Sequence, residues 1–278
     1  MLKVMTLNLN YYVTKHGPWP VRKELVHAAI RAAEPDMIAL QAVGKDPAVA
    51  NGADQAAQLR ELLPEYRQVI FQPAMDFEDG SLGGSAILSK IEASGIDHLA
   101  LTLLPGLDDP HRRVLLHARF DLPAGPLHLF NAHFSWVGEQ ARLNLEEAIA
   151  YTGSFLVAGR QAPALLVGDL NTPAGSELWA TFEQAGWSDL WAELCPEETG
   201  NTFESDDPSI RIDYAWMNRE LRPLARSIEI VADNRHASGA RPSDHFGLLL
   251  SLDLDLAAFH IPKPILEKAK LIGGTNVQ

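Results

Sequence analysis

The chain has 278 residues, 46% of them hydrophobic, and a formal net charge of −13 at pH 7. This composition suffices for a large buried core, and at about 150 residues per domain the length would permit two domains. The excess of acidic side chains argues against loose, counterion-driven binding to nucleic acid, although it does not exclude a nuclease whose metal site acts locally.

A single domain is nevertheless the favoured organisation. No Gly/Ser-rich or Pro-rich linker divides the sequence, and strand-like segments are spread from residue 2 to residue 252. We expect one domain over residues 1–260 and a C-terminal tail over residues 261–278. That tail holds Lys263, Lys268 and Lys270, and its packing against a second copy of the chain would make the protein a homo-oligomer.

The cysteine content and the N-terminal residues indicate a cellular location. Cys195 is the only cysteine, so no intramolecular disulfide can form and a reducing compartment is the simplest assignment. Residues 1–10 alternate like a strand and lack the basic and apolar regions of a signal peptide, and no apolar run approaches the roughly 20 residues of a membrane span. These features predict a cytoplasmic protein without a membrane span.

Hydrophobic periodicity predicts alternating strands and helices in the first part of the chain. The predicted order is a strand over 3–9, a helix over 21–34, a strand over 37–43, a helix over 54–63 and a strand over 66–71. Pro35 ends the first helix, because proline cannot continue the helical hydrogen-bond pattern.

Successive strands follow an acidic, glycine-rich loop over 76–84. We predict strands over 85–89, 99–103, 114–122 and 127–134, and the short turns between them imply antiparallel pairing. The remaining elements are a helix over 139–157, a strand that ends at Asp169, a helix over 175–185, a loop to Ser209, strands over 212–217 and 224–231, a loop over 233–243 and a strand over 246–254. Mixed sheets with helices between strands predict an α/β or α+β layered fold.

Polar residues suited to phosphate or metal chemistry lie at the ends of several predicted strands. The apolar run 165–167 stops at Asp169 and Asn171, and open α/β sheets bind ligands at the carboxyl ends of their strands. Each such residue alone could instead be a turn former, a helix cap or a satisfied core residue. Such residues lie at the ends of five predicted strands, and five coincidences are harder to explain in that way. Besides Asp169 and Asn171, the residues are Asn8, His133, Asp213, Asp244 and His245.

Seven short motifs, five of which contain these residues, follow one another along the chain. They are Thr6-Leu7-Asn8, Leu40-Gln41-Ala42-Val43, Gly84-Ser85-Ala86-Ile87-Leu88-Ser89, Asn131-Ala132-His133-Phe134, Gly168-Asp169-Leu170-Asn171, Ile212-Asp213-Tyr214 and Ser243-Asp244-His245. In order and spacing they resemble the motifs of the endonuclease/exonuclease/phosphatase superfamily, from residue 4 to about residue 252. The resemblance implies an α/β (α+β) four-layer sandwich of two packed mixed β-sheets flanked by helices, and a divalent-metal-dependent hydrolase of phosphate esters.

The resemblance assigns catalytic roles to three of the matching residues. His245 would act as general base on the attacking water, Asp213 would orient His245, and Asp169 would position that water or help to deprotonate it. These roles agree with the chemistry of the side chains, because histidine titrates near neutrality and a carboxylate partner fixes its tautomer.

The resemblance also implies how the phosphate and the metal ion are held. Asn171 and His133 would hold the phosphoryl oxygens, while Asn8, Asp244 and position 42 would form the metal end of the site. In-line attack on a phosphoester builds negative charge on the phosphoryl oxygens and the leaving group, and donors and a cation stabilise that charge. Hard oxygen ligands suit Mg²⁺ or Mn²⁺ as the cofactor.

Residue 42 departs from the family's pattern. Where this chain has Gln41-Ala42 the family has Gln-Glu, and that glutamate is the principal carboxylate ligand of the metal ion. Three explanations are open: a substitution made to disable the enzyme, a natural pseudoenzyme, and a nearby carboxylate such as Asp46 that takes over the role. The first is favoured, because every other polar position matches the pattern.

Loops near the expected site would select the substrate. The candidate substrate-binding residues are His16, Trp19, Trp136, Arg142 and Phe203. The aromatic rings would stack on a base or a lipid head group, or else simply pack their loops. Arg112 and Arg113 precede a strand and form either a phosphate clamp or, as we slightly favour, a solvated pair.

The leading interpretation is a metal-dependent phosphodiesterase or nuclease that uses in-line attack of a His-activated water and is impaired in this form by Ala42. A phosphatase or phosphodiesterase for small or lipid phosphates is the second interpretation. The third belongs to a different class, a catalytically inactive pseudoenzyme that binds a phosphate ligand, and Ala42 is the feature that favours it.

Overall fold

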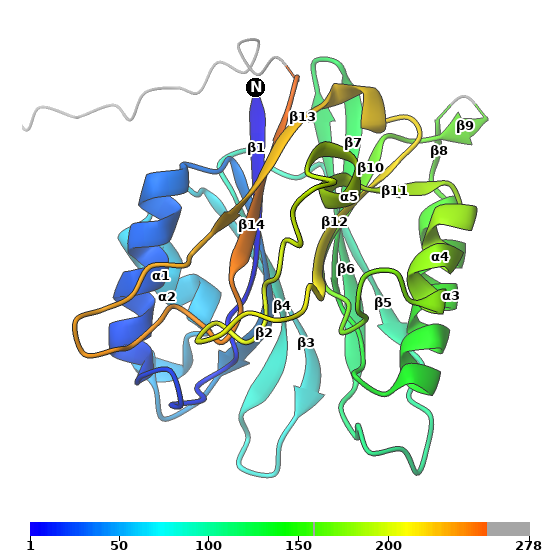
Figure 1. Ribbon diagram of the computed structural model, residues 1–278. Coiled ribbons are helices and arrows are strands. Elements are labelled where there is room, and N and C mark those ends of the chain that lie inside the picture. The colour runs from blue at the N-terminus through cyan, green and yellow to red at the C-terminus, as the bar shows by residue number, and fades with distance from the viewer. Residues whose placement is uncertain (158, 255–278) are drawn as a thin grey trace, which may run out of the picture.

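Two six-stranded β-sheets pack face to face in the computed structural model, and helices cover their outer faces (Figure 1). The structure describes residues 1–157 and 159–254. The tail expected over 261–278, and with it the expected contact of a homo-oligomer, lies outside the described residues, and the single domain expected over 1–260 stays a prediction. The succession of helices, sheet, sheet and helices confirms the four-layer α/β (α+β) sandwich.

The first sheet draws its strands from both ends of the chain. Its β1 and β2 are parallel, whereas β14 pairs antiparallel with β1. Helices α1 (Trp19–Ala33) and α2 (Gln55–Leu62) cover its outer face (Figure 1). The strand order is β13 (Ala225–Val231), β14 (Gly247–Leu252), β1 (Leu2–Asn8), β2 (Met37–Lys45), β4 (Leu82–Ser89) and β3 (Gln68–Asp76).

The second sheet is built from the middle of the chain. Its β7 and β10 are parallel, and β12 pairs antiparallel with β10. Helices α3 (Gly138–Gly153) and α4 (Glu177–Gln184) cover its outer face. The strand order is β11 (Trp187–Asp189), β12 (Asp213–Asn218), β10 (Ala164–Asp169), β7 (Gly125–His133), β6 (Arg113–Leu122) and β5 (Gly95–Leu101).

Alternation along the strands gives each sheet two apolar faces. In β1, Val4 packs in the core between the two sheets, whereas Met5 packs in the layer under α1 and α2. In β10, Leu165 and Val167 belong to the core between the sheets, and Leu166 packs under α3 and α4. Successive side chains of a strand point to opposite faces, so nearly continuous apolar runs are required where both faces are covered.

The structure differs from the sequence-based prediction in several short segments. The helix expected over 139–157 ends at Gly153, after which the short strands β8 (Leu156–Val157) and β9 (Arg160–Gln161) pair. The loop expected before Ser209 contains β11 and α5 (Leu190–Leu194), whose Trp187, Leu190 and Trp191 are buried. The acidic loop expected over 76–84 is shorter, because β3 runs to Asp76 and β4 begins at Leu82.

Two short 3-10 turns complete the list of elements, at Ala50–Gly52 and Arg222–Leu224. Among the described residues, no helix combines the length and the apolar character needed to cross a membrane.

Candidate active site

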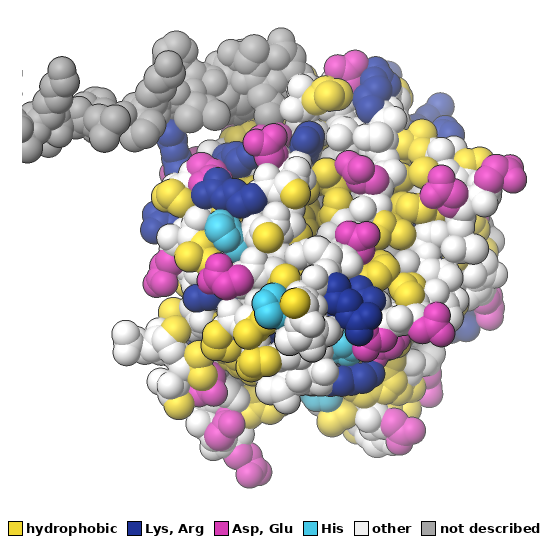
Figure 2. Space-filling view, turned by 60° about the vertical axis from the view of Figure 1, so that its left-hand side comes forward, with side chains coloured by type: hydrophobic (Ala, Val, Ile, Leu, Met, Phe, Trp, Pro, Cys, Tyr) yellow, Lys and Arg dark blue, Asp and Glu magenta, His cyan; other side chains and the backbone are white. Residues whose placement is uncertain are grey.

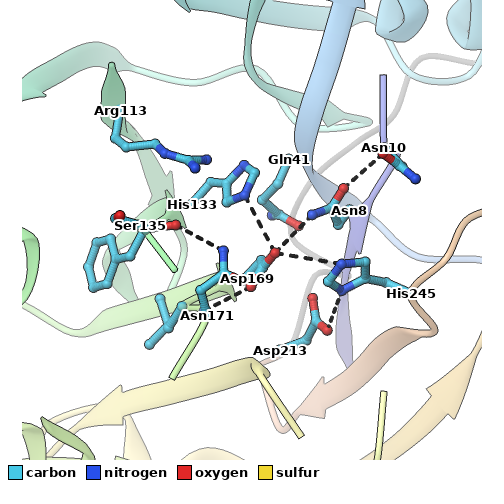
Figure 3. Close-up of polar contacts among 12 residues, drawn as sticks. Asn8, Asn10, Gln41, Arg113, His133, Ser135, Asp169, Asn171, Asp213 and His245 are labelled. Atoms are coloured by element: carbon cyan, nitrogen blue, oxygen red, sulfur yellow. Dashed lines mark hydrogen bonds and ion pairs between the residues drawn. The ribbon is translucent and has the colours of Figure 1, made fainter. Parts of the chain in front are cut away.

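Strand alternation carries polar side chains into the space between the sheets at one end of the sandwich. Along β1 the inward positions after Val4 are Thr6 and Asn8, and along β10 the position after Val167 is Asp169. Both strands end here, and Asn8 Nδ2 donates a hydrogen bond to Asp169 Oδ2 at 2.9 Å (Figure 3). Residues 161 positions apart in the chain are thereby joined across the two sheets.

A pair of buried amides joins the sheets next to this contact. Gln41 of β2 donates from Nε2 to Asn131 Oδ1 of β7 at 2.6 Å. Asn131 Nδ2 in turn donates to the backbone carbonyls of Leu40 and Ala86, both at 2.9 Å. Because each partner is fully buried, the two amides hold the separation of the sheets beside the site.

Asp169 lies at the centre of the polar cluster. Its Oδ1 accepts a hydrogen bond from the Asn171 backbone N–H at 2.9 Å, and its Oδ2 lies 3.5 Å from His133 Nε2 and 3.7 Å from His245 Nε2. Burial raises the pKa of Asp169 to about 6, against the opposing attraction of His245. The carboxylate therefore changes its charge close to neutral pH.

His245 and Asp213 form a buried pair beside Asp169. His245 Nδ1 lies 2.9 Å from Asp213 Oδ2, which leaves Nε2 directed towards Asp169. Burial by itself lowers the pKa of the imidazole, but attraction to Asp213 and Asp169 outweighs it and raises the pKa to about 10. Asp213 reaches this position as the first residue of β12, on the strand face that carries Ala215 into the core.

His133 has the opposite electrostatic environment. It ends β7, and its pKa lies well below the ordinary value, first because burial disfavours the charged ring and then because Arg113 and His245 repel it. A neutral imidazole is the consequence at neutral pH. His133 can therefore donate one hydrogen bond to a phosphoryl oxygen without adding a charge.

A cleft with a volume of about 220 Å³ opens over these groups. It is lined by Asn8, Asn10, Tyr11, Ala42, His111, Arg113, His133, Trp136, Asp169, Asn171, Asp244 and His245. The pattern of strand ends therefore brings Asn8, His133, Asp169, Asn171 and His245 into one cavity, as sequence reasoning expected of their positions. Asp244 and the proposed substrate-binding residue Trp136 also line it.

Arg113 and Trp136 form one wall of the cleft. Arg113 Nη2 donates to Asp109 Oδ2 at 2.9 Å, and its guanidinium carbon lies 5.3 Å from the centroid of the Trp136 ring. His111 lies beside them, with Nδ1 2.8 Å from Asp109 Oδ1 and its ring centroid 5.4 Å from that of Trp136. Within the described residues, Arg113 Nε makes no hydrogen bond, although the side chain is buried. Arg113 is buried, which contradicts the favoured interpretation that Arg112 and Arg113 form a solvated pair. Arg112 is exposed, as that interpretation expected.

Ala42 lies in an irregular segment of β2 that faces the cleft. The pairing of β2 with β4 shifts register between Leu40 and Val43, and Ala42 adopts a left-handed backbone with φ of 47°. Its carbonyl accepts a hydrogen bond from the Tyr11 backbone N–H at 2.7 Å. The side chain at position 42 therefore points into the cleft from a fixed backbone, and a methyl group is all that it offers.

The donor set fits a hard divalent ion in chemical type but lacks one charge. Asp244 supplies a carboxylate and Asn8 an amide oxygen, which are the ligand types that Mg²⁺ and Mn²⁺ prefer. Ala42 supplies no ligand atom. Asp46 does not replace it, because Asp46 is not among the residues lining the cleft.

Four of the five predicted substrate-binding residues do not line the cleft, and His16 is one of them. Trp19 is buried in α1, where its Nε1 donates to Gln58 Oε1 at 2.9 Å, because the helix begins two residues earlier than predicted. Arg142 lies on the exposed side of α3, 3.4 Å from Glu177. The Phe203 ring packs against the His245 ring, with centroids 4.8 Å apart, without lining the cleft.

Sequence reasoning missed three residues of the lining, Asn10, Tyr11 and His111. Asn10 and Tyr11 directly follow β1, so their proximity to Asn8 was a usable signal. His111 gave none, because a loop of irregular backbone carries it. Arg113 was considered as a phosphate clamp, but the solvated pair was favoured, and alternation along β6 groups Arg113 with the outward-facing Leu115.

Comparisons with known proteins agree with this architecture. The Endonuclease/Exonuclease/phosphatase family matches residues 5–245 of the chain. An endonuclease/exonuclease/phosphatase from Beutenbergia cavernae superimposes with a TM-score of 0.73 at 24% identity, covering 91% of this chain and 71% of that one. The mannosyl-6-phosphatase Bt3783 of Bacteroides thetaiotaomicron (TM-score 0.67, 18% identity) covers 91% of this chain and 99% of that one.

A third similar structure is truncated Caenorhabditis elegans TDP2, with a TM-score of 0.63, 16% identity and coverage of 90% of this chain and 96% of that one. At these identities the likenesses show a shared fold. No curated protein sequence matches the chain significantly.

Proposed function

This chain belongs to the endonuclease/exonuclease/phosphatase family, and from that premise we propose that it is a divalent-metal-dependent phosphoester hydrolase, with phosphodiesters, including nucleic acids, as its leading substrate class. The observation that carries the proposal is the buried series Asp213, His245 and Asp169 at the floor of an open cleft. Such a series can orient a water molecule and accept its proton during in-line attack.

Asp213 is the positioning residue of the series. Its contact with His245 Nδ1 at 2.9 Å fixes the ring so that Nε2 faces the cleft. Without a bound cation, the pKa of about 10 keeps the His245 imidazole protonated at neutral pH. A divalent ion held beside Asp244 would oppose the charge of the carboxylates and lower that pKa, and we then assign His245 Nε2 as the acceptor of the water proton. Asp169 would hold the water, and Asn8 fixes the Asp169 carboxylate through its 2.9 Å hydrogen bond. The negative phosphate would be held by donors from His133 and Asn171.

Asp244 and Asn8 would hold the ion, together with the carboxylate that position 42 lacks here. When bound, the ion would neutralise the acidic floor and polarise the phosphate oxygens. Arg113, with its free Nε, supplies fixed positive charge on the opposite wall of the cleft, so a phosphate between the two walls would find donors on both sides.

Ala42 should impair turnover in this form of the protein. The remaining polar groups keep an organised set of contacts, which argues for a loss confined to one position, as a substitution made to disable the enzyme would produce. A pseudoenzyme that binds a phosphate ligand is the rival of another class, and Ala42 is what favours it.

A phosphatase or phosphodiesterase for small or lipid phosphates is the second candidate activity. The cleft of about 220 Å³ is small, and one of the similar structures is a mannosyl-6-phosphatase. Figure 2 shows acidic and basic side chains interspersed among apolar ones, and the described residues on that face form no continuous basic stripe. This surface suits a compact substrate at least as well as a long polyanion. The single cysteine supports action in a reducing cytoplasm.

The test is turnover of a substrate panel by His245→Ala, made in an Ala42→Glu background. The panel contains DNA, RNA, a nucleotide, a phospholipid and matched aryl phosphate mono- and diesters, each with Mg²⁺ and with Mn²⁺. We expect the parent to hydrolyse at least one diester and His245→Ala to lose about 10²-fold or more, since a positioned base contributes roughly 10²–10⁴. Substitution of the exposed His236 by alanine is the control. Equal turnover by parent and His245→Ala would contradict the role of His245.

A further inference from the structure

A second cluster of metal-ligating side chains lies outside the catalytic cleft. It comprises His16, from the segment between β1 and α1, and Glu204 and Asp206, from the segment between α5 and β12. One ligand atom of each lies within 4.8 Å of those of the other two. None of the three lines the catalytic cleft, so the cluster requires its own explanation.

His16 is buried and directed into this cluster. Its side chain is 3% exposed, and Nε2 lies 2.8 Å from Glu204 Oε1 and 3.5 Å from Asp206 Oδ2. Within residues 1–157 and 159–254, neither ring nitrogen of His16 nor Glu204 Oε1 makes a hydrogen bond, so the 2.8 Å contact lacks hydrogen-bond geometry. Buried polar atoms of this kind call for a partner.

The two carboxylates divide their oxygens between basic residues and His16. Glu204 Oε2 pairs with Lys15, and Asp206 Oδ1 accepts from Arg241 Nε at 3.0 Å and lies 3.9 Å from Arg235. The other oxygens, Glu204 Oε1 and Asp206 Oδ2, face His16 Nε2. The basic side chains thus hold the carboxylates in place while one lone-pair-bearing oxygen of each stays directed at the imidazole.

We propose that His16 Nε2, Glu204 Oε1 and Asp206 Oδ2 bind a divalent transition-metal ion, Zn²⁺ or an ion of similar preference. Imidazole and carboxylate ligands suit this class, whereas Mg²⁺ and Ca²⁺ favour oxygen ligands alone. Bond lengths of about 2.0–2.2 Å place neighbouring ligand atoms roughly 3.0–3.5 Å apart. The contacts of 2.8 and 3.5 Å from His16 need only small side-chain shifts to reach that spacing.

The ion would brace the segment that carries the catalytic histidine. The Ser205 N–H, between the two carboxylate ligands, donates to the Asp244 carbonyl at 2.7 Å, and Ser205 Oγ donates to the Ser243 carbonyl at 2.8 Å. The Arg241 backbone N–H donates to the His16 carbonyl at 3.0 Å. A metal ion would therefore join two loops, each of which is hydrogen-bonded to the segment that precedes His245, without contacting the substrate. The site is independent of the proposed activity.

Co²⁺ is the probe, because its visible spectrum reports bound nitrogen and oxygen ligands. We expect the chain with Ala42 and no further substitution to bind Co²⁺ with a distinct visible spectrum, and Zn²⁺ to displace the Co²⁺ from that site. His16→Ala and Glu204→Gln should each weaken that binding at least about tenfold, since each removes a direct ligand of the metal ion. His236→Ala, at an exposed neighbouring histidine, and His245→Ala, in the catalytic cluster, should retain it.

The competing outcome is an imidazolium–carboxylate ion pair that binds no metal. In that case the chain with no further substitution shows no saturable Co²⁺ spectrum, or His16→Ala and Glu204→Gln keep the spectrum unchanged, and the proposal fails. Loss of the spectrum in His236→Ala or His245→Ala would assign the ion to another site and would equally overturn it. Glu204→Gln leaves the buried imidazole in place, so it decides the question if His16→Ala does not fold.

Discussion

Replacing Ala42 with glutamate should restore the missing charge at the metal end of the cleft. The backbone at position 42 already has φ of 47°, and alanine and glutamate carry the same left-handed penalty because both have a Cβ atom. The new side chain would extend into the cleft of about 220 Å³ towards Asn8 and Asp244. The substitution therefore changes the charge of the site with little change in backbone strain.

The expected magnitude follows from two opposing electrostatic effects. An added carboxylate attracts the ion, and two unit charges 4 Å apart interact by about 4 kcal/mol at an effective dielectric constant of 20. It also repels the carboxylates of Asp169 and Asp244; burial, together with repulsion from Asp213, already raises the pKa of Asp169 to about 6, so a further negative charge beside it carries a cost. We expect a net gain of at least about 1.4 kcal/mol, which is a tenfold tighter Kd for Mg²⁺ or Mn²⁺.

Calorimetric titration of Mg²⁺ and Mn²⁺ into the Ala42 chain, Ala42→Glu and Ala42→Gln measures this difference. The glutamine variant is the matched control, because it has the shape of glutamate without its charge. Hydrolysis of the substrate panel by the three forms should rise only in Ala42→Glu. If glutamate and glutamine variants bind metal equally weakly and both stay inert on every phosphoester, the reasoning is refuted and the pseudoenzyme interpretation replaces it.

Further predictions concern substrate charge and stability. Arg113→Ala should lower kcat/KM about 10- to 100-fold, because it removes a charge-assisted hydrogen bond to phosphate. Arg112→Ala, at the exposed neighbouring residue, should change kcat/KM little. Equal losses in the two variants would mean a diffuse charge effect. If the substrate is a long nucleic acid, the salt dependence of binding should correspond to only about two to four phosphate contacts, and a slope for about eight or more would reveal a basic groove that we have overlooked. Burial lowers the pKa of His117 from 6.5 to about 4, so the unfolded chain binds the extra proton first as the pH falls. His117 should therefore contribute a fall in the free energy of unfolding of on the order of 2–3 kcal/mol between pH 6.5 and pH 4, measured as the difference between urea titrations of the parent and of His117→Phe over that range.

The sequence predicted the elements whose pattern is long and periodic. Strands such as β1 and β10 have both faces covered, so their apolar runs stand out, and the polar residue that ends each strand, Asn8 or Asp169, marks the edge of the core. This is why Asn8 and Asp169 could be assigned to the site before their contact across the sheets was known. Helix α1 was recognised for the same reason, although its start was misplaced by two residues.

Short and irregular segments could not be predicted in the same way. Strand β11 has only 3 residues and α5 only 5, too few to show a period, and the burial of Trp187 and Trp191 is a property of the assembled sheet. Trp19 and Trp136 illustrate the same limit. Both are tryptophans in segments expected to be loops, yet Trp19 is buried at the start of α1 and Trp136 is 50% exposed beside the cleft, and no local pattern distinguishes them.

The site is divided between two sheets, so its geometry depends on how those sheets pack against each other. Asn8 and Gln41 belong to one sheet and Asp169 and Asn131 to the other, and two side-chain hydrogen bonds of 2.9 and 2.6 Å cross the interface between them. The first sheet also places its last strand, β14, beside its first, β1. A growing chain consequently cannot assemble the cleft until β14 has been added, and a slip of one sheet over the other would separate the reacting groups while leaving every strand intact. Loss of activity should thus precede loss of secondary structure during gradual denaturation.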